Sequence, residues 1–132
     1  MRGDRTQNSP PLVLVVEDNP VNLELVFALL EEQACKVLTA RTGDAALQIL
    51  ATSRPDLILM DVQLPGMNGY QVTRRIKAIP ALAGIPVVVL TAHALASDQA
   101  LAREAGCSAF LAKPIDVRMF KETLRVFLKA ES

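Results

Sequence analysis

The sequence predicts an α/β fold in which a five-stranded parallel sheet is covered by helices on both faces. Short apolar runs alternate along the chain with segments whose apolar residues recur at helical spacing, and this alternation implies parallel strands. The runs are apolar at consecutive positions, as in LVLVV at residues 12–16, rather than at every second position. Strands of that kind are buried on both faces, so we expect helices above and below the sheet.

The expected strands are apolar runs that stop at polar or turn-forming residues. They lie at residues 12–16, 36–40, 56–60, 85–91 and 108–112. The first leads into Asn19-Pro20, where Asn19 is expected to cap a helix and Pro20 to take its first position. After the second, Thr42-Gly43-Asp44 opens a short helix that ends by Arg54-Pro55.

The third helix follows the turn sequence LPGMNG at residues 64–69 and carries Val72, Ile76 and Ile79 on one face. The fourth is expected over about residues 94–105, with Gly106 as its C-terminal cap. Asp116 is expected to cap the fifth. That last helix ends at about residue 129 and is lined by Val117, Phe120, Leu124 and Phe127.

Length and composition restrict the protein class. With 132 residues, 51% hydrophobic and 21% charged, the chain fits one globular domain. The formal net charge is zero, so nothing suggests nucleic-acid binding, and no apolar run is long enough to span a membrane. Cys35 and Cys107 lack metal-site or redox-motif spacing and are expected to be reduced, buried thiols. We therefore expect a cytoplasmic protein.

Polar residues that can carry chemistry follow four of the five strands. Glu17 and Asp18 follow the first, Asp61 the third, Thr91 the fourth and Lys113 the fifth. In an open parallel sheet these positions share one edge, which is where such folds bind ligands. Three carboxylates brought together there would repel one another, and each would raise the pKa of the others. A hard divalent cation such as Mg²⁺ relieves that repulsion and also binds phosphate oxygens.

The same residues suit phosphoryl transfer. Asp61 can be the nucleophile, because carboxylates form acyl phosphates. Lys113 can neutralise phosphoryl charge, and the Thr91 hydroxyl can donate a hydrogen bond to it. Ala92 has a small side chain that leaves the approach open. The strand ends therefore predict a site for Mg²⁺ and a phosphoryl group.

Four motifs in this order resemble the receiver domain of two-component response regulators, the CheY-like family. They are VVEDN, LILMDVQLPGMNG, VVVLTA and AFLAKP, and the resemblance extends over about residues 12–128. It implies a doubly wound sheet with strand order 2-1-3-4-5. It also implies that Asp61 accepts a phosphoryl group from a histidine on a partner kinase or phosphotransfer protein.

The resemblance assigns the remaining roles residue by residue. Asp18 would bind Mg²⁺ directly, Glu17 would bind it directly or through water, and the backbone carbonyl of Gln63 would complete the protein ligands. Thr91 would hydrogen-bond the phosphoryl group and Lys113 would pair with it.

Two further features are implied. The Lys113–Pro114 peptide would be cis. Phe110 occupies the aromatic switch position, which is often Tyr in the family. As Thr91 moves toward the phosphoryl group, Phe110 would swing inward and change a protein-binding face made by the fourth helix, the fifth strand and the fifth helix.

Residues 1–11 are expected to be a disordered arm and residues 12–129 a receiver domain with no output domain. A single-domain regulator that binds a downstream protein is the first functional hypothesis. The alternative is the receiver module of a hybrid histidine kinase, or a phosphorelay intermediate that passes the phosphoryl group on. A phosphatase with an aspartyl-phosphate intermediate is disfavoured, because Gln63 stands where its general acid would be. We therefore expect no enzyme beyond assistance to its own phosphorylation and dephosphorylation.

Overall fold

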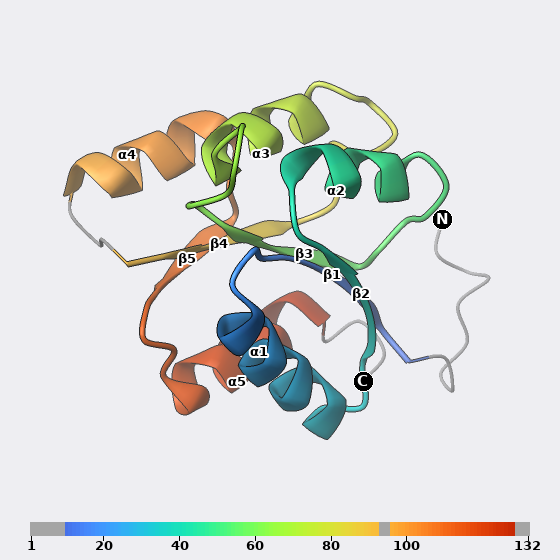
Figure 1. Cartoon of the computed structure of the whole chain (residues 1–132), viewed down its shortest axis with the longest axis vertical. Coiled ribbons are helices and arrows are strands. Elements are labelled where there is room, and N and C mark those ends of the chain that lie inside the picture. The colour runs from blue at the N-terminus through green and yellow to red at the C-terminus, as the bar shows by residue number, and fades with distance from the viewer. Residues whose placement is uncertain (1–9, 93–95, 129–132) are drawn as a thin grey trace.

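The computed structural model describes residues 10–92 and 96–128 of the chain, and five strands alternate there with five helices (Figure 1). The strands are β1 (Leu12–Val16), β2 (Lys36–Ala40), β3 (Leu57–Asp61), β4 (Val87–Thr91) and β5 (Ala109–Ala112). The helices are α1 (Pro20–Glu32), α2 (Gly43–Leu50), α3 (Gly69–Lys77), α4 (Ala96–Ala105) and α5 (Val117–Leu128).

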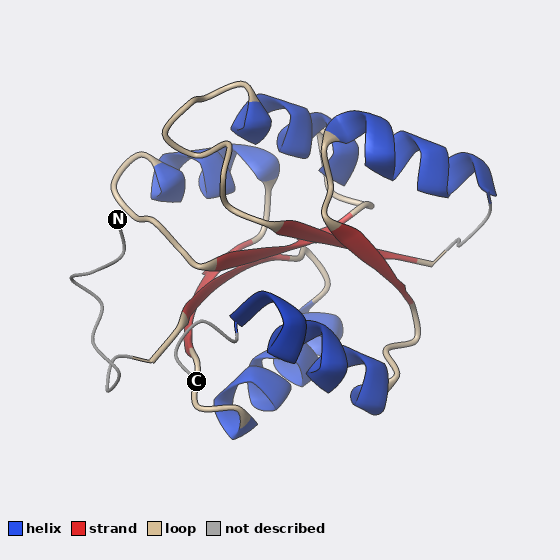
Figure 2. Cartoon of the chain, turned by 180° about the vertical axis from the view of Figure 1, so that it is seen from behind, coloured by secondary structure: helices blue, strands red, loops and turns tan. Residues whose placement is uncertain are grey.

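All strand pairs are parallel, and the order across the sheet is β2-β1-β3-β4-β5. Helices α2, α3 and α4 cover one face of the sheet, and α1 and α5 cover the other (Figures 1 and 2). The predicted doubly wound fold and its strand order are confirmed. This order brings the carboxyl ends of β1, β3, β4 and β5 to the same edge.

The core consists of two apolar layers, one on each side of the sheet. In β1, Leu14 and Val16 pack under α2 and α3, whereas Val13 and Val15 pack against α1 and α5. All four residues are fully buried. The consecutive apolar positions of the sequence are thus explained, because alternate side chains serve opposite layers.

The predicted helix caps are present. The Asn19 side chain accepts hydrogen bonds from the backbone N–H groups of Val21 and Asn22, with Pro20 at the first helical position. Thr42 caps α2, and Asp116 Oδ1 accepts from Met119 N at 3.1 Å at the start of α5. Gly106 follows α4 with a φ of 96°, which suits glycine because it has no Cβ.

Several boundaries differ from the sequence prediction. Strand β3 begins at Leu57 rather than Asp56. Asp56 still meets Leu12 of β1, because its backbone N–H donates to the Leu12 carbonyl at 2.7 Å and its Oδ2 accepts from Leu12 N at 2.8 Å. Strand β4 begins at Val87, two residues after Ile85. Ile79 lies beyond the end of α3 and is 41% exposed, and Val117 is 44% exposed, so neither lines its helix as predicted.

The predicted N-terminal arm, the predicted start of the fourth helix and the predicted end of the fifth helix fall partly outside the described residues. Residues 1–9, the first positions of the fourth helix at 94–95, and residue 129 are among those not described. The Pro11 carbonyl accepts a hydrogen bond from Lys36 N at 2.8 Å, so contacts with the sheet begin before Leu12.

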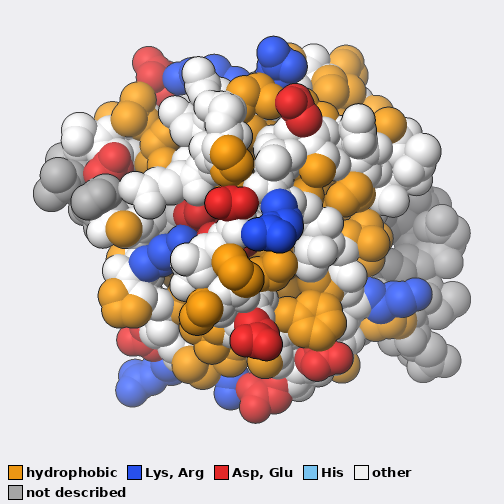
Figure 3. All heavy atoms as spheres, in the orientation of Figure 1, with side chains coloured by type: hydrophobic (Ala, Val, Ile, Leu, Met, Phe, Trp, Pro, Cys, Tyr) orange, Lys and Arg blue, Asp and Glu red, His pale blue; other side chains and the backbone are white. Residues whose placement is uncertain are grey.

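Among the described residues, no helix has the length and apolar character needed to cross a membrane. Acidic and basic side chains are interspersed on the face shown in Figure 3, with hydrophobic side chains between them. This face therefore presents no extended basic surface among its described residues, which agrees with the absence of net charge.

Candidate phosphoryl-transfer site

The four strand ends at this edge each supply a predicted functional residue. Glu17 follows β1, and its backbone N–H donates to the Ala40 carbonyl at 2.9 Å, which continues the pairing with β2. Asp61 is the last residue of β3 and Thr91 the last of β4. Lys113 follows β5, and its backbone N–H donates to the Thr91 carbonyl at 2.8 Å. Backbone pairing between the strands thus fixes the Cα positions of these four residues.

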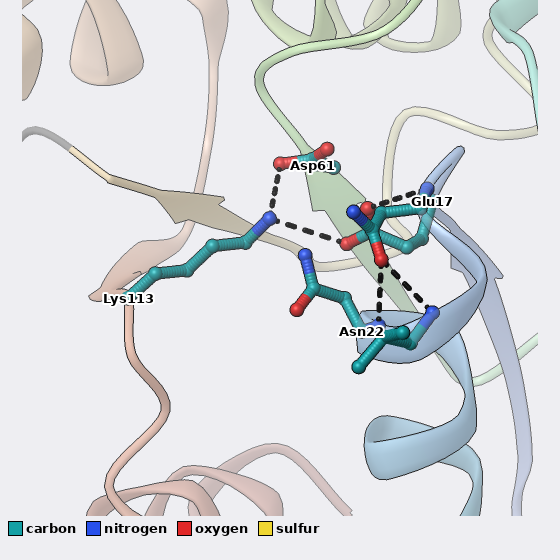
Figure 4. Close-up of polar contacts among 6 residues, drawn as sticks. Glu17, Asn22, Asp61 and Lys113 are labelled. Atoms are coloured by element: carbon teal, nitrogen blue, oxygen red, sulfur yellow. Dashed lines mark hydrogen bonds and ion pairs between the residues drawn. The ribbon is translucent and has the colours of Figure 1, made fainter.

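A lysine lies between two buried carboxylates (Figure 4). Lys113 Nζ is 2.9 Å from Asp61 Oδ1 and 3.3 Å from Glu17 Oε1. Glu17 is 1% exposed and Asp61 is 4% exposed. Glu17 Oε2 also accepts a hydrogen bond from the backbone N–H of Asn19 at 3.1 Å. The structure therefore brings together Glu17, Asp61 and Lys113, three of the predicted site residues.

Burial raises the pKa of Glu17 above its ordinary value of 4.5. The Asn19 backbone N–H and the Lys113 ammonium act in the opposite direction, whereas the neighbouring Asp61 carboxylate raises the pKa further. Burial and the second carboxylate prevail, so the net direction of the Glu17 pKa is upward.

Asp18 lies apart from this cluster. Its side chain is 51% exposed, and Oδ1 is 4.0 Å from Arg41 Nη2, which also donates to the Asp18 carbonyl at 3.2 Å. Successive side chains of an extended segment point in opposite directions, so Glu17 turns inward and Asp18 outward. The expectation that three carboxylates converge here is wrong: two do, and Lys113 supplies the cation between them. A direct contact of Asp18 with Mg²⁺ stays a prediction.

The donor set nevertheless fits Mg²⁺. That ion binds hard oxygen ligands, needs only one or two carboxylates and keeps several waters. Glu17 and Asp61 offer two buried carboxylates at the edge of the sheet. Within the described ranges, no three or more His, Cys, Asp or Glu side chains are grouped so that they could hold a metal ion. The positions beyond these two carboxylates would therefore go to waters, to a carbonyl, or to Asp18 if its side chain turned inward. Gln63, predicted to supply that carbonyl, is two residues past Asp61 and exposed.

The remaining predicted residues lie around the cluster. Thr91 is buried, and Ala92 beside it is exposed, as an open approach requires. Phe110 is half-buried in β5 opposite Val89, and it packs against the apolar layer under α2, α3 and α4. The Lys113–Pro114 peptide is cis, as the resemblance implied.

Two residues at the site had no predicted role. Arg41 pairs with Asp18, and its signal in the sequence was a basic residue directly after the second strand. Gly69 at the start of α3 lies against the end of β3, since a Cβ there would be 2.3 Å from the Asp61 carbonyl oxygen. Its signal was the last glycine of LPGMNG, which sequence alone assigns only to a turn.

Comparison with known proteins decides the family. The sequence model described as response regulator receiver domain matches residues 13–125. The chain belongs to the response regulator receiver domain family. The polar-differentiation response regulator DivK of Brucella anthropi is 41% identical over 119 residues, which is 90% of this receiver and 97% of that protein. The protein of the same description from Brucella ovis is 40% identical over 116 residues, or 88% and 94% of the two chains.

Solved receiver structures have the same fold. A putative response regulator from Chloroflexus aurantiacus has a TM-score of 0.88 and 30% identity, covering 92% of this receiver and 99% of that chain. The receiver domain of a sensor histidine kinase from Pseudomonas aeruginosa has a TM-score of 0.85 and 34% identity, with the same coverage. That second structure is described with a magnesium ion coordinated in its active site cleft.

Proposed function

We propose that this receiver accepts a phosphoryl group on Asp61 from a phosphohistidine of a histidine kinase or phosphotransfer protein, with Mg²⁺ as cofactor. The observation that carries the proposal is the placement of Asp61 Oδ1 2.9 Å from Lys113 Nζ at the end of a buried strand. A carboxylate held beside an ammonium, next to the buried Thr91, suits attack on a phosphoryl group whose oxygens need compensating charge.

The transfer is a displacement at phosphorus. One carboxylate oxygen of Asp61 forms a bond to phosphorus while the bond from phosphorus to the donor nitrogen breaks, and the electron pair of that bond stays with the imidazole. Lys113 balances charge on the transferred oxygens, and Thr91 donates a hydrogen bond to them. Glu17 and Asp61 would hold Mg²⁺, and the bound ion would supply further compensating charge. Asp18 and the Gln63 carbonyl are its other proposed protein ligands.

We further propose that the phosphoryl group biases a two-state switch. Phe110 is half-buried in this structure, so inward movement would bury more of its ring and change how β5 and α4 meet. The face of α4, β5 and α5 would then bind a downstream protein. No nucleic acid or membrane is part of this proposal, and the location remains the predicted cytoplasm.

A second candidate is supported by the solved structures. Two receivers that come from histidine kinases, of Syntrophus aciditrophicus and Pseudomonas aeruginosa, are 33% and 34% identical to this chain. The chain would then pass the phosphoryl group onward to a histidine. Incubating the phosphorylated protein with a histidine phosphotransfer domain separates the two: onward transfer supports the second candidate, and retention on Asp61 supports the first.

The test of phosphorylation is incubation with acetyl phosphate and Mg²⁺, followed by intact-protein mass spectrometry. We expect one added phosphoryl group that is stable to acid and labile to base. Asp61→Ala should remain unlabelled, and chelation of Mg²⁺ should abolish labelling of the unsubstituted protein. Equal labelling of Asp61→Ala would contradict the assignment.

A further inference from the structure

Asn22 faces the protein from the first turn of α1. The Asn19 side chain fixes this turn, because its Oδ1 accepts hydrogen bonds from Val21 N at 2.9 Å and Asn22 N at 3.1 Å. Val21 is 72% exposed, whereas Asn22 is half-buried. The turn therefore presents Val21 to solvent and Asn22 to the strand ends.

The side chain of Asn22 is directed toward the cluster. Side chains in a helix lean toward its N-terminus, and α1 starts three residues after Glu17. Figure 4 shows the amide of Asn22 extending from α1 toward Lys113 and Glu17. None of the roles given above to Glu17, Asp61, Thr91 or Lys113 uses this amide.

The chemistry of the cluster leaves a place for such a group. Thr91 at the end of β4 and Lys113 after β5 can donate hydrogen bonds to a phosphoryl group. On the β1 side the neighbouring side chain is Glu17, and an ionised carboxylate can only accept hydrogen bonds. An amide has two N–H donors and carries no charge. Asn22 can therefore add a donor on the β1 side without adding negative charge.

We propose that Asn22 is a further contact of the phosphoryl group at Asp61, and that its amide donates a hydrogen bond to a phosphoryl oxygen during transfer. This inference rests on the proposed function, because it presupposes that Asp61 accepts the group. Asn22 would then be a third donor to the group, beside Lys113 and Thr91.

The experiment measures the rate of phosphorylation by acetyl phosphate at saturating Mg²⁺. Asn22→Ala should be slower by about tenfold, the effect of losing one hydrogen bond to a charged group. Asn22→Asp should be slower still, because a new carboxylate repels the phosphoryl oxygens. Asn22→Ser keeps a donor and should recover part of the rate. Val21→Ala is the matched control from the same helical turn and should react like the unsubstituted protein.

Two further readouts separate this role from a structural one. The dissociation constant for Mg²⁺, measured by calorimetry, and the urea midpoint of unfolding should be unchanged in Asn22→Ala. An unsubstituted protein that takes no phosphoryl group would contradict the proposed function itself. If the unsubstituted protein and Val21→Ala react but Asn22→Ala matches them, the contact is refuted. The proposed contact is also refuted if the whole rate loss in Asn22→Ala is explained by weaker Mg²⁺ binding or by a lower urea midpoint.

Discussion

At the residue scale, the adjacent carboxylates Glu17 and Asp18 have opposite environments. Glu17 is buried beside Lys113, whereas Asp18 is half-exposed beside Arg41. Two buried carboxylates share one ammonium, so the cluster of Glu17, Asp61 and Lys113 carries an excess of negative charge when its groups are ionised. Such an excess is costly inside a protein and is relieved by a bound cation. This balance of charge is what the proposed binding of Mg²⁺ would change.

Replacing Lys113 tests this balance of charge. Lys113→Met leaves Glu17 and Asp61 without their cation, and we expect the free energy of unfolding in metal-free buffer to fall by about 3 kcal/mol. The loss of unfolding free energy in Lys113→Met should be smaller with saturating Mg²⁺. The ion would replace the positive charge that the variant lacks, so it should stabilise the folded variant more than the unsubstituted protein. Urea unfolding with and without chelator measures both values.

The control is Lys121→Met. Lys121 Nζ lies 3.8 Å from Glu32 Oε1 in an exposed pair, and such pairs contribute about 0–1 kcal/mol. Equal effects of the two substitutions, or a loss in Lys113→Met that Mg²⁺ does not reduce, would contradict the charge argument.

Cys107 gives a prediction of pH dependence. Within the described part of the chain, neither Cys35 nor Cys107 forms a disulfide, and both are half-buried rather than fully buried as predicted. Burial raises the pKa of the Cys107 thiol above its ordinary value of 9.0, while the Thr73 side chain and Lys77 act in the opposite direction. The thiolate is the reactive form, so the alkylation rate should still be rising with pH at 9.0, where an ordinary thiol is already half ionised, and should level off only at higher pH.

Iodoacetamide labelling of a Cys35→Ser variant from pH 7 to 11 measures this profile. The same variant unfolded in urea is the control, because its thiol titrates without burial. A folded midpoint at or below that of the unfolded chain would refute the predicted direction.

At the element scale, the turn between β3 and α3 sets the position of Asp61, the proposed acceptor. Gly69 starts α3, and its backbone N–H donates to the Val62 carbonyl at 2.9 Å, directly after Asp61. Asn68 and Gln71 form a reciprocal capping box that fixes the helix start. The helix thereby packs its first residue against the backbone of the acceptor strand.

A methyl group at Gly69 should disturb this contact. In Gly69→Ala, the new Cβ would lie 2.3 Å from the Asp61 carbonyl oxygen and 2.9 Å from Val62 Cα, so the backbone must shift. We expect a loss of about 2 kcal/mol in unfolding free energy, with slower phosphorylation because Asp61 is displaced. Gly84→Ala is the control, since no atom lies within 4 Å of its Cβ position. Similar stability of the two variants would contradict the packing argument.

The elements were predictable because their signals are local. Consecutive apolar residues located the strands, and Asn19, Thr42 and Asp116 located three helix starts. The direction of Asp18 was not predictable, because it depends on the ladder continuing through Glu17 to Ala40, which are distant in sequence. Similarly, the hydrogen bond from Leu12 N to Asp56 Oδ2 joins residues that are 44 positions apart. Local patterns carry no information about such long-range partners.

At the scale of the whole molecule, the strand order makes the site. In the sheet, β1 lies beside β3, and β4 and β5 come next. This order brings Glu17 and Lys113 into contact although they are 96 positions apart in the sequence. Phe110 and Thr91 lie on neighbouring strands β5 and β4, so the site is connected through the sheet to the layer under α4. Once a parallel sheet was inferred, the sequence could predict that residues at the strand ends share one edge of the sheet. The strand order itself came from the family resemblance.

This connection predicts a directional response. Adding Mg²⁺ and beryllofluoride, which mimics a phosphoryl group on a carboxylate, should shift the backbone amide signals of Thr91, Phe110 and the described part of α4. Signals of Glu31 and Gln33, at the distant end of α1, should stay in place. Two-dimensional NMR measures both sets. Shifts confined to Glu17, Asp61 and their chain neighbours would contradict the switch.

The account depends most directly on which carboxylate receives the phosphoryl group. Borohydride reduces an acyl phosphate to an alcohol, so a phosphorylated aspartate is converted to homoserine. After treatment with acetyl phosphate, Mg²⁺ and borohydride, peptide mass spectrometry should find homoserine at position 61. Unreduced carboxylates are expected at Glu17 and Asp18. Reduction at either of those residues, or none at Asp61 in a protein that has gained the phosphoryl mass, would contradict the account.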